Sequence, residues 1–169
     1  MTSKMRFLKT KILPAMVILC ITTACSSPKK DTKAEANIKM FMHVWDEILN
    51  KKNLSMFNES NYTKTITLHA SPSAVVGIDS ARAYYASYLS GFSDIDFIIK
   101  DAIGMDEKLS VYWNFKGTHT GLFFGIPPTG QKVDIEGVTL VRMENGKIAE
   151  ERDFLDNLEF MQQLGLIPK

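Results

Sequence analysis

Three stretches of the chain repeat apolar residues with the period of an α-helix. The first covers residues 34–51, where apolar positions recur three and four residues apart. The second covers residues 81–90, with Ser80 as its expected N-cap, and the third opens at Asp156 and ends at Gly165. This spacing gathers apolar side chains on one side of each helix, so all three segments are predicted to pack on a core.

Elsewhere the pattern changes to the alternation that is typical of β-strands. Strands are predicted over residues 63–69, 95–103, 109–119, 132–143 and 147–155. The pair Asn145–Gly146 predicts a tight hairpin between the last two strands. Helices come first, an antiparallel run of strands follows, and one helix ends the chain. This order indicates an α+β fold with a curved antiparallel sheet packed on helices.

Residues 117–130 interrupt this alternation with four glycines and two prolines. Glycine reaches backbone conformations closed to other residues, and consecutive prolines cannot continue a sheet ladder, so a shaped loop between two strands is expected. His119 lies where the first of these strands ends, next to Leu122, Phe123 and Phe124. A polar ring in this company suggests the mouth of an apolar pocket. The alternative is a long hairpin connection with an exposed histidine.

The first 24 residues carry four basic residues, then a short apolar run, and lead into Thr-Thr-Ala-Cys. This arrangement resembles a bacterial lipoprotein signal, in which Cys25 is lipidated and becomes the new N-terminus. A plain secretory signal or an uncleaved anchor is the alternative. We therefore expect a signal peptide over residues 1–24, a polar tether over 25–34 and one domain over 35–169. A lipid on Cys25 would hold that domain at the bacterial cell envelope, in the periplasm or at the outer membrane.

The composition narrows the classes of function. A chain of 169 residues with 45% apolar and 23% charged residues is typical of one folded domain. Without residues 1–24 the formal net charge falls from +1 to −3, and a mildly acidic domain gives no support for nucleic-acid binding. Cys25 would be the single cysteine of the mature chain, so no disulfide is expected within it. Three histidines without paired spacing predict no metal site, and no cofactor is expected.

Four segments together resemble the SnoaL-like polyketide (ester) cyclases. They are residues 77–103, the loop at 117–130, the stretch 146–150 and the tail 156–165, and the resemblance covers about residues 35–169. It implies a cone-shaped NTF2-like fold whose bent sheet and helices enclose a deep apolar pocket for a small apolar carbonyl compound. This fold commonly forms homodimers through the outer sheet face, which leaves a homodimer open for this chain.

The resemblance also implies a chemistry, an intramolecular aldol condensation that needs no metal. One carboxyl group can take and give the proton if loss of water raises its pKa. By its position relative to the tail, Asp156 matches the family's acid/base aspartate, and His119 matches the signature histidine that could orient substrate. A second interpretation of Asp156 is a capping box with Glu159, in which it accepts backbone N–H groups and needs no pocket.

Further residues are candidates for the wall of the pocket. They are His69 at a strand end, Trp113 and Tyr85 on apolar faces, and Arg142 with Asp153. Arg142 departs from the family pattern, since several cyclases have histidine there. Arginine cannot exchange protons at neutral pH, although it could hold an enolate oxygen.

Three functions therefore remain open. The first is a lipid-anchored protein that binds a small apolar carbonyl compound and transfers a proton on it to close a ring. The second is a non-catalytic ligand-binding or interaction module of the envelope. The third, from fold analogy alone, is an epoxide-hydrolase-type reaction in which Arg142, Asp153 and Asp156 activate water.

Overall fold

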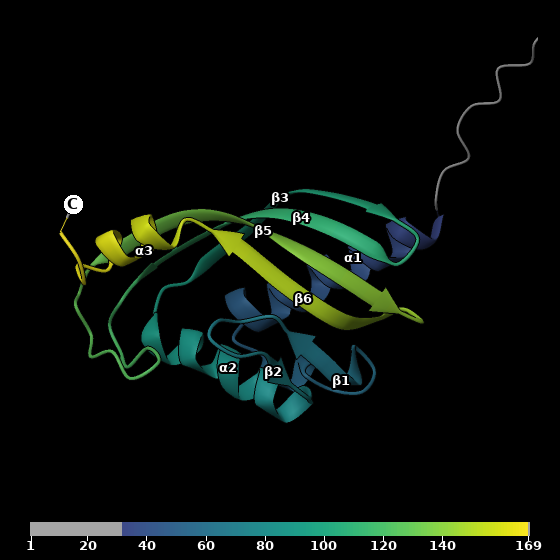
Figure 1. The fold of residues 1–169 in the computed structure, drawn as a ribbon, viewed down its shortest axis with the longest axis horizontal. Coiled ribbons are helices and arrows are strands. Elements are labelled where there is room, and N and C mark those ends of the chain that lie inside the picture. The colour runs from purple at the N-terminus through teal and green to yellow at the C-terminus, as the bar shows by residue number, and fades with distance from the viewer. Residues whose placement is uncertain (1–31, 169) are drawn as a thin grey trace, which may run out of the picture.

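The computed structural model describes residues 32–168, in which one six-stranded sheet is covered by helices (Figure 1). The helices are α1 (Thr32–Trp45), α2 (Ile78–Gly91) and α3 (Asn157–Gln163), and α1 runs on into a π-helical turn at Asp46–Asn50. A short 3-10 turn, Leu54–Met56, follows. The strands are β1 (Tyr62–Leu68), β2 (Val75–Val76), β3 (Asp96–Met105), β4 (Lys108–Thr118), β5 (Lys132–Glu144) and β6 (Lys147–Leu155).

The strands lie in the order β2-β1-β6-β5-β4-β3. The long strands β3 to β6 form the expected antiparallel run, joined by hairpins. The sheet is nevertheless mixed, because β1 pairs parallel to β6. After β1 and β2 the chain runs through α2 to β3 at the opposite edge of the sheet. It then returns through β4 and β5 to β6, which lies next to β1. The α+β class with a curved sheet is therefore confirmed, with one parallel pair that the pattern did not predict.

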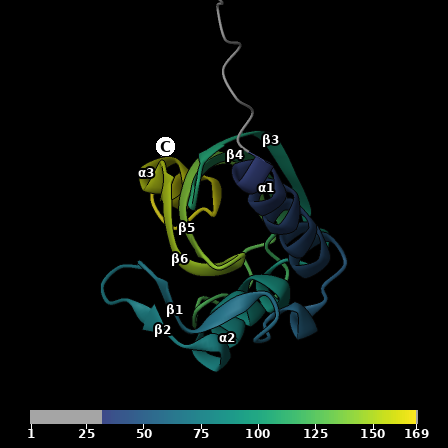
Figure 2. The same cartoon turned by 90° about the vertical axis from the view of Figure 1, so that its right-hand side faces the viewer.

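The sheet curls, and α1 and α2 lie on its concave side (Figure 2). Strand alternation decides which side chains enter that side. On β4 and β5 the odd-numbered positions are buried and most even-numbered positions are exposed. The inward apolar residues pack with Trp45, Phe57 and Tyr85 into the main core, while a second cluster gathers around Phe92 and Phe123 near α3.

Strand ends lie within two residues of their predicted positions, while two helices begin earlier than predicted. The N-cap of α2 is Gly77, three residues before the expected Ser80, and no side chain caps this helix end. The helix α1 begins at Thr32, inside the segment predicted as tether. The predicted signal peptide and Cys25 lie outside the described residues. Among residues 32–168, no helix is both long and apolar enough to cross a membrane.

The loop at 117–130 rests against the end of α2. The backbone N–H groups of Thr120 and Gly121 both donate to the carbonyl oxygen of Gly91, at 2.9 and 3.0 Å. A Cβ atom on Gly121 would lie 2.0 Å from the carbonyl oxygen of Ser90. The loop can therefore approach the helix this closely only because residue 121 has no side chain.

We predict that Gly121→Ala destabilises the protein by about 1–3 kcal/mol, since the added methyl group must push the loop away from α2. The neighbouring Thr120→Ala, at an exposed position, should change stability by less than about 0.5 kcal/mol. Urea denaturation of the three proteins measures both effects. Equal stability of the two variants would contradict the contact described here.

Candidate functional site

A cavity with two lobes lies between the concave face of the sheet and the helices. The inner lobe measures about 60 Å³ and the outer lobe about 220 Å³. Both lobes are lined by Tyr85, Tyr88, Asp153, Leu155 and Phe160, so they form one continuous space. An apolar chamber that opens into a more polar vestibule is a common form of small-molecule site.

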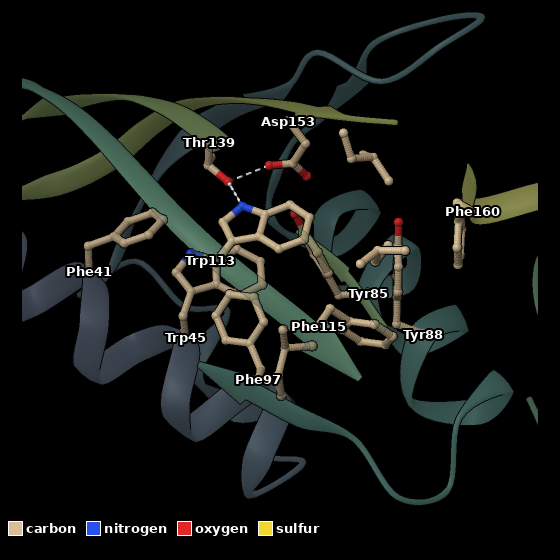
Figure 3. Close-up of a pocket in the computed structure, with 13 residues that line it drawn as sticks. Phe41, Trp45, Tyr85, Tyr88, Phe97, Trp113, Phe115, Thr139, Asp153 and Phe160 are labelled. Atoms are coloured by element: carbon tan, nitrogen blue, oxygen red, sulfur yellow. Dashed lines mark hydrogen bonds between the residues drawn. The ribbon is translucent and has the colours of Figure 1, made fainter. Parts of the chain in front are cut away.

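Aromatic rings make up most of the inner wall (Figure 3). They come from α1, α2, α3 and from inward positions of β3 and β4, and they are Phe41, Trp45, Tyr85, Tyr88, Phe97, Trp113, Phe115 and Phe160. Neighbouring rings meet edge-on or tilted, as Trp45 does with Tyr85 at a centroid distance of 4.5 Å. Such a wall favours a flat, apolar ligand.

Trp113 is fixed in this wall by its neighbours on β5. Its ring lies over Gly137, where a Cβ atom would come within 2.3 Å of the indole. The indole Nε1–H donates to Thr139 Oγ1 at 2.8 Å, and the Thr139 hydroxyl donates to Asp153 Oδ1 at 2.6 Å (Figure 3). This chain of hydrogen bonds crosses three strands and holds the Asp153 carboxyl at the junction of the two lobes.

Asp153 is the acidic group of the inner lobe. Crowding by protein raises the pKa of its carboxyl above the usual value, and the hydrogen bond from Thr139 opposes that rise. Protein surrounds the Asp153 side chain on most sides, but the residue is exposed by its surface area. Water in the cavity can therefore reach it. A carboxyl group whose pKa is raised in this way is a stronger base than an ordinary aspartate and can both accept and return a proton.

Glu151, two residues earlier on β6, points to the same side and lines the outer lobe. It is only 2% exposed. Burial, and secondarily the nearby Asp153, raises the pKa of Glu151 well above its usual range, while the hydrogen bond from Trp45 and the nearby Tyr85 hydroxyl oppose the rise. Because Glu151 is sealed from water and Asp153 is not, burial acts more strongly on Glu151.

His69 lines the outer lobe but is bound to groups on the outer sheet face. Its Nε2 lies 3.0 Å from Glu150 Oε2, and Arg152 Nη2 lies 3.2 Å from its Nδ1. Arg142 also pairs with Glu150, at 3.2 Å. Arg142 lies on an outward position of β5 and its side chain is 61% exposed. The cavity therefore contains no part of Arg142, and both ring nitrogens of His69 already have partners.

The two residues predicted as catalytic lie apart from the cavity wall. Asp156 is the exposed N-cap of α3, and its Oδ1 accepts the backbone N–H of Glu159 at 2.9 Å, as the capping-box alternative requires. His119 is fully buried, with its ring against Phe92 at a centroid distance of 5.5 Å. Its Nδ1 accepts the backbone N–H of Thr129 at 3.4 Å and so closes the loop at 117–130.

The structure thus brings Trp113, Tyr85 and Asp153 to one cavity, with His69 at its outer lobe. Asp156, His119 and Arg142 are not among the lining residues of that cavity. Arg142 lies outside the cavity because strand alternation turns its side chain to the outer face of β5. Asp156 lies outside it because β6 has ended there and the chain turns into α3. Sequence reasoning did not select Thr139, Glu151 or Gly137. Alternation could have found the first two, because Thr139 shares the inward face of β5 with Ile135 and Val141, and Glu151 shares that of β6 with Asp153.

Comparison with known proteins gives a consistent family. The model of the SnoaL-like polyketide cyclases matches residues 39–164. Aklanonic acid methyl ester cyclase of Streptomyces peucetius is 40% identical over 58 residues, which cover 34% of this chain and 37% of that protein. Nogalonic acid methyl ester cyclase of Streptomyces nogalater is 37% identical over 57 residues, or 34% of this chain and 42% of the relative. The matched segments thus span less than half the length of these relatives.

Solved structures share the fold over most of the described residues. A protein from Jannaschia sp. CCS1, assigned as a SnoaL-like polyketide cyclase, superposes with a TM-score of 0.75 at 25% identity, covering 84% of this chain and 100% of its own. TsrD from Streptomyces laurentii superposes with a TM-score of 0.70 at 21% identity, covering 78% and 97%. At this identity the second match supports the fold alone.

We predict that Asp156→Ala lowers the free energy of unfolding by about 1 kcal/mol, because α3 loses its side-chain cap. Asp156→Asn should leave stability nearly unchanged, since asparagine caps as well as aspartate. Chemical denaturation of both variants measures the difference. A loss as large in the asparagine variant would show that the charge, rather than the cap, is what Asp156 supplies.

A second prediction concerns the pH dependence of stability. The folded state keeps the proton of Glu151 to a higher pH than the unfolded chain does, so this group weakens the fold as pH rises above about 4, the pKa of an unfolded glutamate. Glu151→Gln should therefore gain stability relative to the unmodified protein between pH 4 and pH 8. Denaturation at a series of pH values tests this, and a relative loss with rising pH would contradict a protonated Glu151.

Proposed function

The chain belongs to the SnoaL-like polyketide cyclase family, and on that premise we propose that its cavity binds a small, largely apolar carbonyl compound on which Asp153 transfers a proton. The observation that carries the proposal is the Asp153 carboxyl, fixed by Thr139 and Trp113 in a wall of aromatic rings. A carboxyl with raised pKa beside an apolar chamber suits a base that must remove a weakly acidic C–H proton.

The reaction is a ring closure of the aldol type. Asp153 removes a proton from the carbon next to a carbonyl group, and the electron pair of the broken C–H bond moves into the enolate. The enolate carbon attacks a second carbonyl carbon of the same molecule, and the oxygen of that carbonyl receives a proton. The net change is one new C–C bond with no redox step, which needs neither oxidant nor reductant. The ester cyclase names of the matched relatives support this assignment.

Shape supports a compact substrate. The lining of the two lobes suits a substrate whose flat apolar part lies against the aromatic inner lobe and whose polar groups lie in the vestibule. Ser71 and Asn157 line that vestibule and can bond to carbonyl or hydroxyl oxygens. A non-catalytic binding protein would use the same cavity without turnover, so the decisive property is proton exchange on the ligand.

Proton exchange can be measured before the natural substrate is identified. In D₂O, β-keto esters with aryl groups should exchange their α-protons faster in the presence of the protein, as followed by NMR. Asp153→Asn should lower this rate at least about a hundredfold, because the general base is lost. Asp156→Asn is the matched control and should retain the full rate.

The rate should rise with pH through the pKa of Asp153, since only the carboxylate can accept the proton. Exchange that is unchanged in Asp153→Asn would contradict the assignment. Binding of the esters without any catalysed exchange would favour the non-catalytic alternative.

A further inference from the structure

Glu151 is a second carboxyl group of the cavity for which the reaction above has no use. Its Oε1 accepts the indole N–H of Trp45 at 3.1 Å. Its Oε2 is buried and makes no hydrogen bond among the described residues. The side chain nevertheless lines the outer lobe, on the same strand face as Asp153. An unpartnered buried oxygen at a cavity wall leaves a hydrogen-bonding site for an occupant of that cavity.

The surroundings of Glu151 disfavour the charged form of its carboxyl group. The titratable groups that face it are Tyr62 from β1, Tyr85 from α2 and Asp153 from β6, and His69 lines the same lobe. No cationic lysine or arginine is among the residues that line either lobe. Nothing in the cavity therefore compensates a second negative charge beside Asp153, and a neutral carboxylic acid carries an O–H donor.

We propose that Glu151 is the proton donor of the site, an uncharged carboxyl group that hydrogen-bonds through Oε2 to the substrate oxygen on which negative charge develops. This rests on the proposed function of Asp153 as base. Two carboxyl groups on one strand face, one reached by water and one sealed, are an arrangement in which the environments separate an acid from a base.

The proton balance closes within the pair. When Asp153 takes the proton from carbon, Glu151 donates its O–H to the carbonyl oxygen that the enolate carbon attacks. The C–C bond forms, the oxygen becomes a hydroxyl group, and Glu151 is left as a carboxylate. The proton held by Asp153 then passes to the Glu151 carboxylate, two residues away on the same strand face, and both groups return to their starting forms.

A phenolate is a stable mimic of the charged oxygen, so 4-nitrophenol serves as the probe because its ionised form is coloured. The Asp153→Asn variant of the full chain removes the charge that would repel it and should bind the phenolate. Adding Glu151→Met removes the donor at similar volume and should weaken binding about ten- to a hundredfold, the usual effect of a hydrogen bond to a charged group. Adding Glu151→Gln keeps an N–H donor and should restore most of the affinity.

The outcomes separate the two proposals. Equal affinity with and without Glu151→Met would overturn the donor role and leave the base intact. Equal losses in the methionine and glutamine variants would also overturn it, since glutamine keeps an acceptor for Trp45 and still offers the phenolate an N–H donor. Failure of the phenolate to bind to Asp153→Asn would contradict the proposed function itself.

A second measurement avoids the methionine variant, because Glu151→Met also removes the acceptor of the Trp45 indole N–H. Infrared difference spectra of Asp153→Asn, with and without Glu151→Gln, identify the C=O band of the protonated Glu151 carboxyl. The band should shift when 4-nitrophenolate saturates the protein, because the O–H group gains an acceptor. A band that does not move at saturation would overturn the proposal.

Discussion

The hydrogen bonds from Trp113 through Thr139 to Asp153 join β4, β5 and β6 across the concave face of the sheet. They place one carboxyl group where the aromatic inner lobe meets the vestibule, and they depend on Gly137 leaving room for the indole. Each donor in this series of three side chains has an acceptor, so the indole N–H and the hydroxyl are both satisfied and the geometry is rigid. The chemistry assigned to the cavity depends on this fixed position of Asp153.

A parallel arrangement repeats two residues earlier on β6, where Glu151 accepts the indole N–H of Trp45. The chain contains two tryptophans, and each is tied to one of the two cavity acids, directly or through Thr139. The aromatic wall that excludes water is therefore held by the same carboxyl groups whose pKa values it raises. Packing and proton chemistry are coupled in this cavity, because a substitution that removes the acceptor oxygen of either carboxyl also frees a residue that holds the wall.

Much of the fold could be predicted from the sequence, since long periodic segments and the Asn145–Gly146 turn are local signals. The parallel pairing of β1 with β6 could not, because it depends on contacts between residues far apart in the chain. For the site, the apolar faces contained Trp113 and Tyr85, and both line the inner lobe. Family position pointed to Asp156, whereas strand alternation would have pointed to Asp153, and the two differ by three residues. The close approach of Trp113 to Gly137 has no signal in a single sequence.

The pKa of the Asp153 carboxyl is the property on which the proposed reaction rests. An NMR titration that follows its side-chain carboxyl carbon, assigned by comparison with Asp153→Asn, measures that property without a substrate. The expected midpoint lies above the ordinary aspartate value of about 3.9. In the variant Trp113→Gly the midpoint should fall toward that value, because water fills the space left by the indole and solvates the carboxylate. A midpoint at or below the ordinary value would mean that Asp153 is a permanently ionised group, and it would contradict its role as the base.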